Sequence, residues 1–95
     1  MEDNRAMTQK KPNVKKTLNE RLHTHGDFSN HARVAQSLKN VLRKEPLYKG
    51  LSDVQVEALE MILHKIARVV SGNPDHKDHW HDIAGYAVLV EERLK

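Results

Sequence analysis

The sequence predicts an all-α protein, a small four-helix bundle, from three observations. Apolar residues recur at steps of three and four along four segments, the spacing of helices that bury one face. No segment shows the alternation of period two that marks a half-buried strand. The connections are short, which favours antiparallel neighbours. With 95 residues, of which 4% are aromatic, we expect one domain with a thin aliphatic core.

The first helix is expected over residues 13–24. Asn13 can cap its N-terminus, and Gly26 can adopt the positive φ at which a helix ends. Residues 1–12 lack apolar periodicity and contain more Lys and Arg than acids, so we expect a disordered basic tail. Residues 13–95 then form a single helical domain.

The second helix is expected over residues 29–45. Asp27 or Ser29 can cap its start, because either side chain accepts hydrogen bonds from the amides of a first helical turn. Pro46 ends it, since proline does not continue a helix. The following segment, EPLYKG, is expected to be a loop.

The third helix, expected over residues 52–71, has the clearest start in the chain. Ser52 and Gln55 match a capping box, and Gly72 marks the end. Apolar side chains cover about half of its circumference; they are Val56, Ala58, Leu59, Ile62, Leu63, Ile66, Val69 and Val70. Such a wide arc predicts a central helix with neighbours on more than one side. It also favours a homo-oligomer, because large exposed apolar patches are unusual on monomers.

The fourth helix is expected over residues 76–93, beginning at Asp75 or Asp78. Its buried seam is expected to consist of Ile83, Ala87, Val90 and Leu94. Gly85 lies inside it, where glycine costs roughly 1 kcal/mol relative to alanine. We therefore expect Gly85 to permit the close approach of another helix or of a ligand.

Two carboxylate pairs on the third and fourth helices form the leading candidate site. Glu57 and Glu60 lie about one turn apart, as do Asp78 and Asp82. Facing carboxylates repel unless something neutralises them, and Mg²⁺ takes oxygen ligands and bridges carboxylates to phosphates. We expect all four to converge on Mg²⁺, with Glu60 and Asp82 as candidate catalytic residues. The alternatives are that Asp78 only caps a helix and that Glu60 only pairs with His64.

Six further residues are candidates for binding a phosphate-bearing ligand: His25, Asp27, Lys65, Arg68, Trp80 and Tyr86. Cationic side chains can hold phosphate oxygens, arginine by bidentate contact, and an aromatic ring can stack on a base. Each type has a structural alternative. The cations can belong to a solvated face, and the aromatic rings can pack in the core.

Composition excludes several other classes. The absence of cysteine rules out disulfides and thiolate metal sites, and zinc binding by His79 and His81 is disfavoured because residues two apart on a helix do not face each other. The net charge of +3 arises in the N-terminal segment, without the aromatic interleaving of nucleic-acid binders, so nucleic acid is not an expected partner.

No apolar run is long enough to span a membrane and no signal peptide is visible, so we expect a cytoplasmic protein without membrane contact. No motif of nucleophilic catalysis is present, which leaves metal-assisted hydrolysis if the protein is an enzyme.

Three motifs resemble a family of small proteins encoded by phages and prophages. They are Arg21 with Gly26-Asp27-Phe28, the segment Lys65-Ile66-Ala67-Arg68, and the helix from Asp78 to Tyr86. The resemblance covers roughly residues 18–95, and it implies no assigned activity. If the chain is phage-encoded, the expected location is the host cytoplasm.

More distantly, the chain is similar to the MazG-like all-α nucleoside triphosphate pyrophosphohydrolases. That resemblance implies an oligomer that binds Mg²⁺ through a Glu-x-x-Glu pair and a second acidic pair, and that releases pyrophosphate from nucleotides. The second pair here has a spacing of four rather than three, and Val56 stands where an additional glutamate is usual. Two alternatives follow: a non-catalytic phage protein that sequesters a nucleotide signal of host defence, and a structural module that self-assembles.

Overall fold

The computed structural model describes residues 13–95 and consists of four α-helices and one short 3₁₀ helix. They are α2 (Val14–His25), α3 (Phe28–Arg43), η1 (Pro46–Gly50), α4 (Asp53–Ser71) and α5 (Lys77–Glu91). This part of the chain contains no strand, which confirms the all-α prediction. The tail expected at residues 1–12 lies outside the described residues.

Three helices begin at the caps that the sequence indicates. The Asn13 side chain accepts a hydrogen bond from the amide of Lys16 at 3.0 Å. Asp27, rather than Ser29, caps α3. Both hydrogen bonds of the Ser52–Gln55 capping box form at the start of α4. Hydrogen bonds with nearby side chains therefore determine where three of the four α-helices begin.

Two predictions about these elements are wrong: the type of one segment and the N-cap of one helix. Within the EPLYKG segment, Pro46–Gly50 form the 3₁₀ helix η1, because Pro46 at the start of η1 has a fixed φ that suits a first helical turn. The N-cap of α5 is His76 rather than Asp75 or Asp78, and its side chain makes no capping hydrogen bond.

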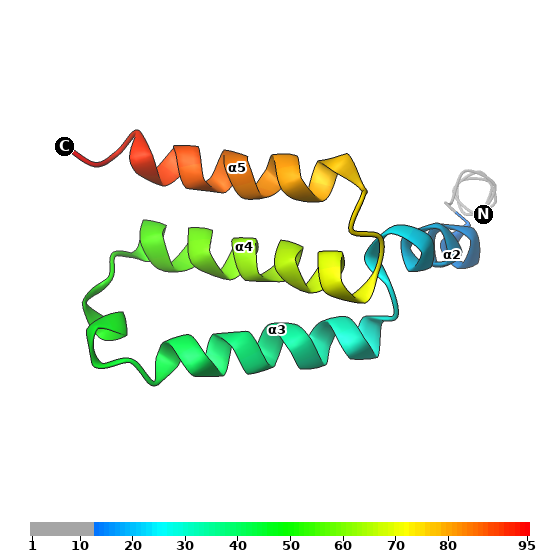
Figure 1. Ribbon diagram of the computed structural model, residues 1–95, viewed down its shortest axis with the longest axis horizontal. Coiled ribbons are helices and arrows are strands. Elements are labelled where there is room, and N and C mark those ends of the chain that lie inside the picture. The colour runs from blue at the N-terminus through cyan, green and yellow to red at the C-terminus, as the bar shows by residue number, and fades with distance from the viewer. Residues whose placement is uncertain (1–12) are drawn as a thin grey trace, which may run out of the picture.

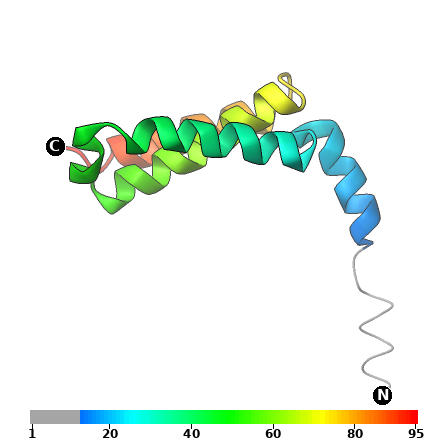
Figure 2. The same ribbon diagram turned by 90° about the horizontal axis from the view of Figure 1, so that it is seen from below.

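The body of the molecule is a layer of three antiparallel helices with α4 in the middle (Figure 1). Both α3 and α5 pack along α4, and their backbones do not approach each other. The backbone of α2 lies against α3 and α4, and side-chain contacts of His79 also join its end to the start of α5. Viewed along the layer, α2 points steeply away from it (Figure 2). The prediction that α4 is the central helix is thus confirmed.

The core of a single chain is thin. The buried apolar residues of the described chain are Ala35, Ala58, Leu63 and Ala67. Among the described residues twelve large apolar side chains are exposed, including Val70 and Leu94, so the apolar arcs expected to be buried are buried only in part. Gly85 has open space where its Cβ would lie, so no other segment within residues 13–95 approaches that position closely. None of the helices described here has the length and apolar character needed to cross a membrane.

Candidate functional site

The carboxylates predicted to share a Mg²⁺ ion lie in separate surroundings. Glu60 faces α3 and η1, because its Oε2 accepts a hydrogen bond from the Tyr48 hydroxyl at 3.5 Å and lies 3.9 Å from Nη2 of Arg43. Asp78 is exposed, and its Oδ2 lies 3.9 Å from Nε2 of His76.

The other two carboxylates lie elsewhere. Glu57 borders a cavity of about 320 Å³ beside Tyr86 and the end of α5. Asp82 Oδ2 lies 2.9 Å from Nζ of Lys65. Within residues 13–95, no group of three or more His, Asp or Glu side chains could hold a metal ion. The predicted convergence is therefore not observed within one chain, and the four acids do not fit a shared Mg²⁺ there. Glu57 and Glu60 differ by about 60° around α4, enough for them to face different neighbours.

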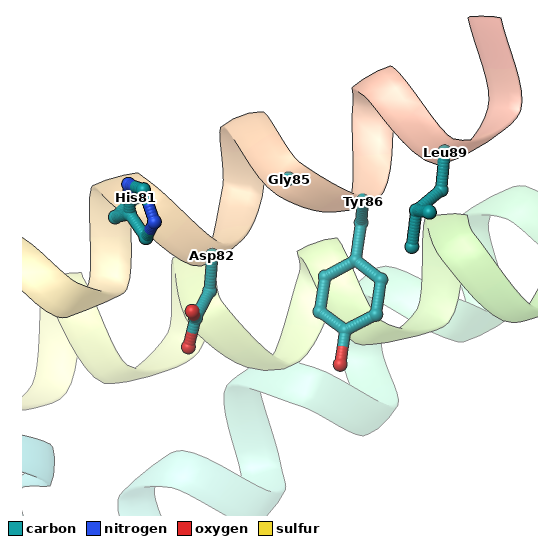
Figure 3. Close-up of a pocket in the computed structure, with 5 residues that line it drawn as sticks. All are labelled: His81, Asp82, Gly85, Tyr86 and Leu89. Carbon is teal, nitrogen blue, oxygen red and sulfur yellow. The ribbon is translucent and has the colours of Figure 1, made fainter. Parts of the chain in front are cut away.

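Lys65 is a buried cation with its own counter-ion. The residue is 8% exposed, and its ammonium pairs with Asp82 across the α4–α5 contact. The hydrogen bond from Lys65 lowers the pKa of the Asp82 carboxyl, and Figure 3 shows this carboxylate pointing from α5 toward α4 beside Tyr86. Lys65 therefore already has a carboxylate partner before any phosphate binds.

Of three other predicted ligand-binding residues, two make local contacts and the third, Tyr86, lines a cavity. Asp27 accepts a hydrogen bond from the Asn30 amide at 3.2 Å as the cap of α3. The Trp80 indole donates to the Pro74 carbonyl at 2.6 Å. Tyr86 lines an open cavity of about 440 Å³ along α5 (Figure 3).

The strongest candidate site is a cavity of about 200 Å³ where α2, α3 and α4 meet. We call it the cationic cavity, and its lining residues are Leu18, Arg21, His25, Gly26, Phe28, His31 and Arg68. Among the described residues that line it, none is acidic. Two of the predicted ligand-binding residues, His25 and Arg68, therefore lie together. Two further basic side chains, those of Arg21 and His31, line the same cavity.

The junction between α2 and α3 fixes the position of His25. Gly26 has a φ of 81°, and a Cβ there would overlap the Ser71 carbonyl, so backbone packs directly on backbone. The Thr24 carbonyl accepts a hydrogen bond from Nε2 of buried His79 at 2.8 Å. These contacts tie the end of α2 to the α4–α5 turn, which gives the cavity one rigid wall.

Burial and nearby cations keep the cavity histidines neutral at pH 7. Burial, and next the charge of Arg68, lowers the pKa of His25 to about 4. Burial also lowers the pKa of His31, followed by the charges of Arg68 and His64. Neutral imidazoles add hydrogen-bonding capacity to the cavity without adding positive charge.

The two arginines of the cavity repel each other. Burial lowers the pKa of Arg68, the nearby Arg21 lowers it further, and Asp82 partly offsets both effects. No ion pair among the described residues joins either arginine to a carboxylate. A bound anion would relieve this repulsion through charge-assisted hydrogen bonds.

An aromatic platform lies beside the cations. Phe28 is 78% exposed, and its ring stacks on that of His31 with centroids 6.1 Å apart and an interplanar angle of 17°. His31 Nδ1 is buried and has no hydrogen-bond partner within the described chain. The cavity thus combines positive charge, an exposed ring and an unused polar atom.

Sequence reasoning did not assign Arg21, Phe28 or His31 to a site. The available signal was their spacing around the helix junction, since Arg21 and Phe28 flank Gly26-Asp27. His31 follows Phe28 by three residues and so shares its helix face. Their convergence with Arg68, on a distant helix, depends on tertiary structure.

Fold and site together define an all-helical domain with a cationic cavity at a helix junction. The chain belongs to the family described as a domain of unknown function, DUF6378, whose model matches residues 12–94. Comparisons with curated proteins and with solved structures found no significant match.

Proposed function

We propose that this protein binds a phosphate-bearing small molecule, a nucleotide by class, in the cationic cavity. The observation that carries the proposal is the convergence of Arg21, Arg68, His25 and His31 on one cavity that no described acid lines. Arginine favours phosphate because its planar fork donates two parallel hydrogen bonds.

Cavity size and surroundings suggest how a nucleotide would lie. Pockets that enclose whole drug-sized ligands have volumes of about 300–1,000 Å³. A cavity of about 200 Å³ suits the phosphate groups alone. The base would then lie outside, stacked on the exposed ring of Phe28.

Binding without turnover is the form of this proposal that the site supports best. A MazG-like, Mg²⁺-dependent pyrophosphohydrolase would need the carboxylates of Glu60 and Asp82 near the phosphates. In one chain Glu60 faces Arg43 and Asp82 pairs with Lys65. A cytoplasmic protein that sequesters a nucleotide, including a phage protein acting on a host signal, fits the cavity better.

Calorimetric titration with the four ribonucleoside triphosphates, with and without Mg²⁺, tests the proposal. We expect binding to the wild type and at least about tenfold weaker binding to Arg68→Ala, because a hydrogen bond to a charged group contributes roughly 1.5–3 kcal/mol. Arg33→Ala is the matched control: exposed Arg33 lies about 200° around α3 from His31, and its loss should leave affinity nearly unchanged.

Equal losses in both variants would show only a non-specific charge effect, and the absence of binding by any nucleotide would refute the proposal. A pyrophosphate-release assay on the same samples separates the two nucleotide hypotheses. Release that Glu60→Gln and Asp82→Asn abolish would favour the enzyme.

We also propose that the protein is a homo-oligomer. Within residues 13–95, α4 is flanked by α3 and α5 while α2 meets only the end of α4 near Ser71, and the stripe of Val14, Leu18 and Leu22 on α2 is more than half exposed. Multi-angle light scattering at micromolar concentration is expected to give a multiple of the 10.9 kDa chain mass. A monomer mass would contradict this expectation. Assembly without nucleotide binding would instead favour the structural module.

A further inference from the structure

The two histidines of the cationic cavity lie in a field of other basic groups. Around His25 these groups are Arg21 on α2, Arg68 on α4, and His76 and His79 at the start of α5. His25 also has ring contacts with His76, at 6.4 Å between centroids, and with His79, at 5.0 Å.

His31 has a similar environment. Its charged and titratable neighbours are Lys39 on its own helix and His64, Lys65 and Arg68 on α4. The rings of His31 and His64 meet edge to face with centroids 5.7 Å apart. Glu60 favours the charged form of His64 but is outweighed by burial, Lys39 and Arg68, which lower that pKa.

We propose that anion binding in the cationic cavity is coupled to proton uptake by His25 and His31, so that the protein binds multiply charged phosphates more tightly as the pH falls. This inference rests on the function proposed above and adds the ligand's charge and the regulation of binding by pH. It makes the two histidines residues that determine specificity, because each proton they take up must be balanced by negative charge on the ligand.

Anion binding and proton uptake affect each other reciprocally. Without a ligand, burial and Arg68 lower the pKa of both rings, so that both are neutral at pH 7. An anion between the arginines favours the protonated rings and raises their pKa. By linkage, a site that gains a proton on binding gains affinity as the pH falls, by up to about tenfold per pH unit for each proton. A monoanion compensates less of the repulsion and should show less uptake.

Calorimetry in two buffers with different ionisation enthalpies, at pH 6 and pH 7.5, measures this proton uptake directly. Sulfate and ATP are the probes, since sulfate does not titrate in this range and any uptake must then come from the protein. We expect net uptake with both and severalfold tighter binding at pH 6. His25→Asn and His31→Asn should each reduce the uptake, whereas His23→Asn, at an exposed position of α2, should not.

The outcomes separate this inference from the proposed function. No binding of either anion at either pH would refute both. Binding with no proton exchange in wild-type protein would refute the coupling and leave the cavity as a binding site. Uptake that persists in both cavity variants, with their helical content intact by circular dichroism, would place the protons elsewhere and overturn the assignment.

Discussion

Replacing Gly26 by alanine is expected to reduce the free energy of unfolding by about 3 kcal/mol or more. Its φ of 81° is strained for a residue with a Cβ, a cost of about 1–3 kcal/mol. A Cβ there would also overlap the Ser71 carbonyl, which is backbone and cannot rotate away. Overlap with backbone places the substitution among the severe ones.

Urea denaturation followed by circular dichroism measures this loss, at one protein concentration because self-association would affect stability. Gly85→Ala is the matched control. Gly85 lies inside α5 with open space around its Cβ position, so alanine should stabilise the protein by up to about 1 kcal/mol. If Gly26→Ala were as stable as the wild type, that result would contradict the close packing of Gly26 on the Ser71 carbonyl.

The ends of the helices show what the sequence predicts well. Gly26 was recognisable as the end of α2, and Asn13, Asp27 and Ser52 as caps, because capping depends on residues within one turn of each other. Local signals were weaker around η1 and at the start of α5. The composition of the EPLYKG segment predicts a loop, whereas Pro46 begins a 3₁₀ helix there. His76 occupies the N-cap position of α5 without a capping hydrogen bond, so no cap signal marks that start.

The candidate site was harder to predict because helix periodicity gives a residue's face but not its partner. Helix periodicity puts Glu60 on the polar arc of α4 and Lys65 at the edge of that arc, yet Glu60 faces α3 while Lys65 is buried against α5. One signal was present for Lys65. It follows buried Ala58 by seven residues and so lies only about 20° from it around the helix.

Histidines separated widely in sequence show the same limit. His25 and His79 meet edge to face, and His79 Nε2 bonds the carbonyl of Thr24, 55 residues away in the chain. Only the way α2 docks on the α4–α5 turn brings them together. Since a carbonyl only accepts hydrogen bonds, Nε2 carries the proton and the His79 ring donates there.

His79→Ala is expected to destabilise the protein by about 2–4 kcal/mol. His79 is the largest fully buried side chain described, at 2% exposure, and its ring packs against those of His25 and His76. Truncation leaves a cavity, and core truncations of this size cost a few kcal/mol. His81→Ala is the control, because His81 is exposed on the same helix and its loss should change stability by less than about 0.5 kcal/mol.

His79→Phe separates ring packing from the hydrogen bond. The Thr24 carbonyl also accepts a hydrogen bond from the Asn73 amide at 3.1 Å, so it keeps one partner when the histidine is lost. We therefore expect Phe to recover most of the stability that Ala loses, leaving a deficit of about 1 kcal/mol. Thermal and urea unfolding of the three variants measure these differences. If His79→Phe were as damaging as His79→Ala, the hydrogen bond rather than the packed ring would hold α2 against α5, and the wall of the cationic cavity would depend on that single contact.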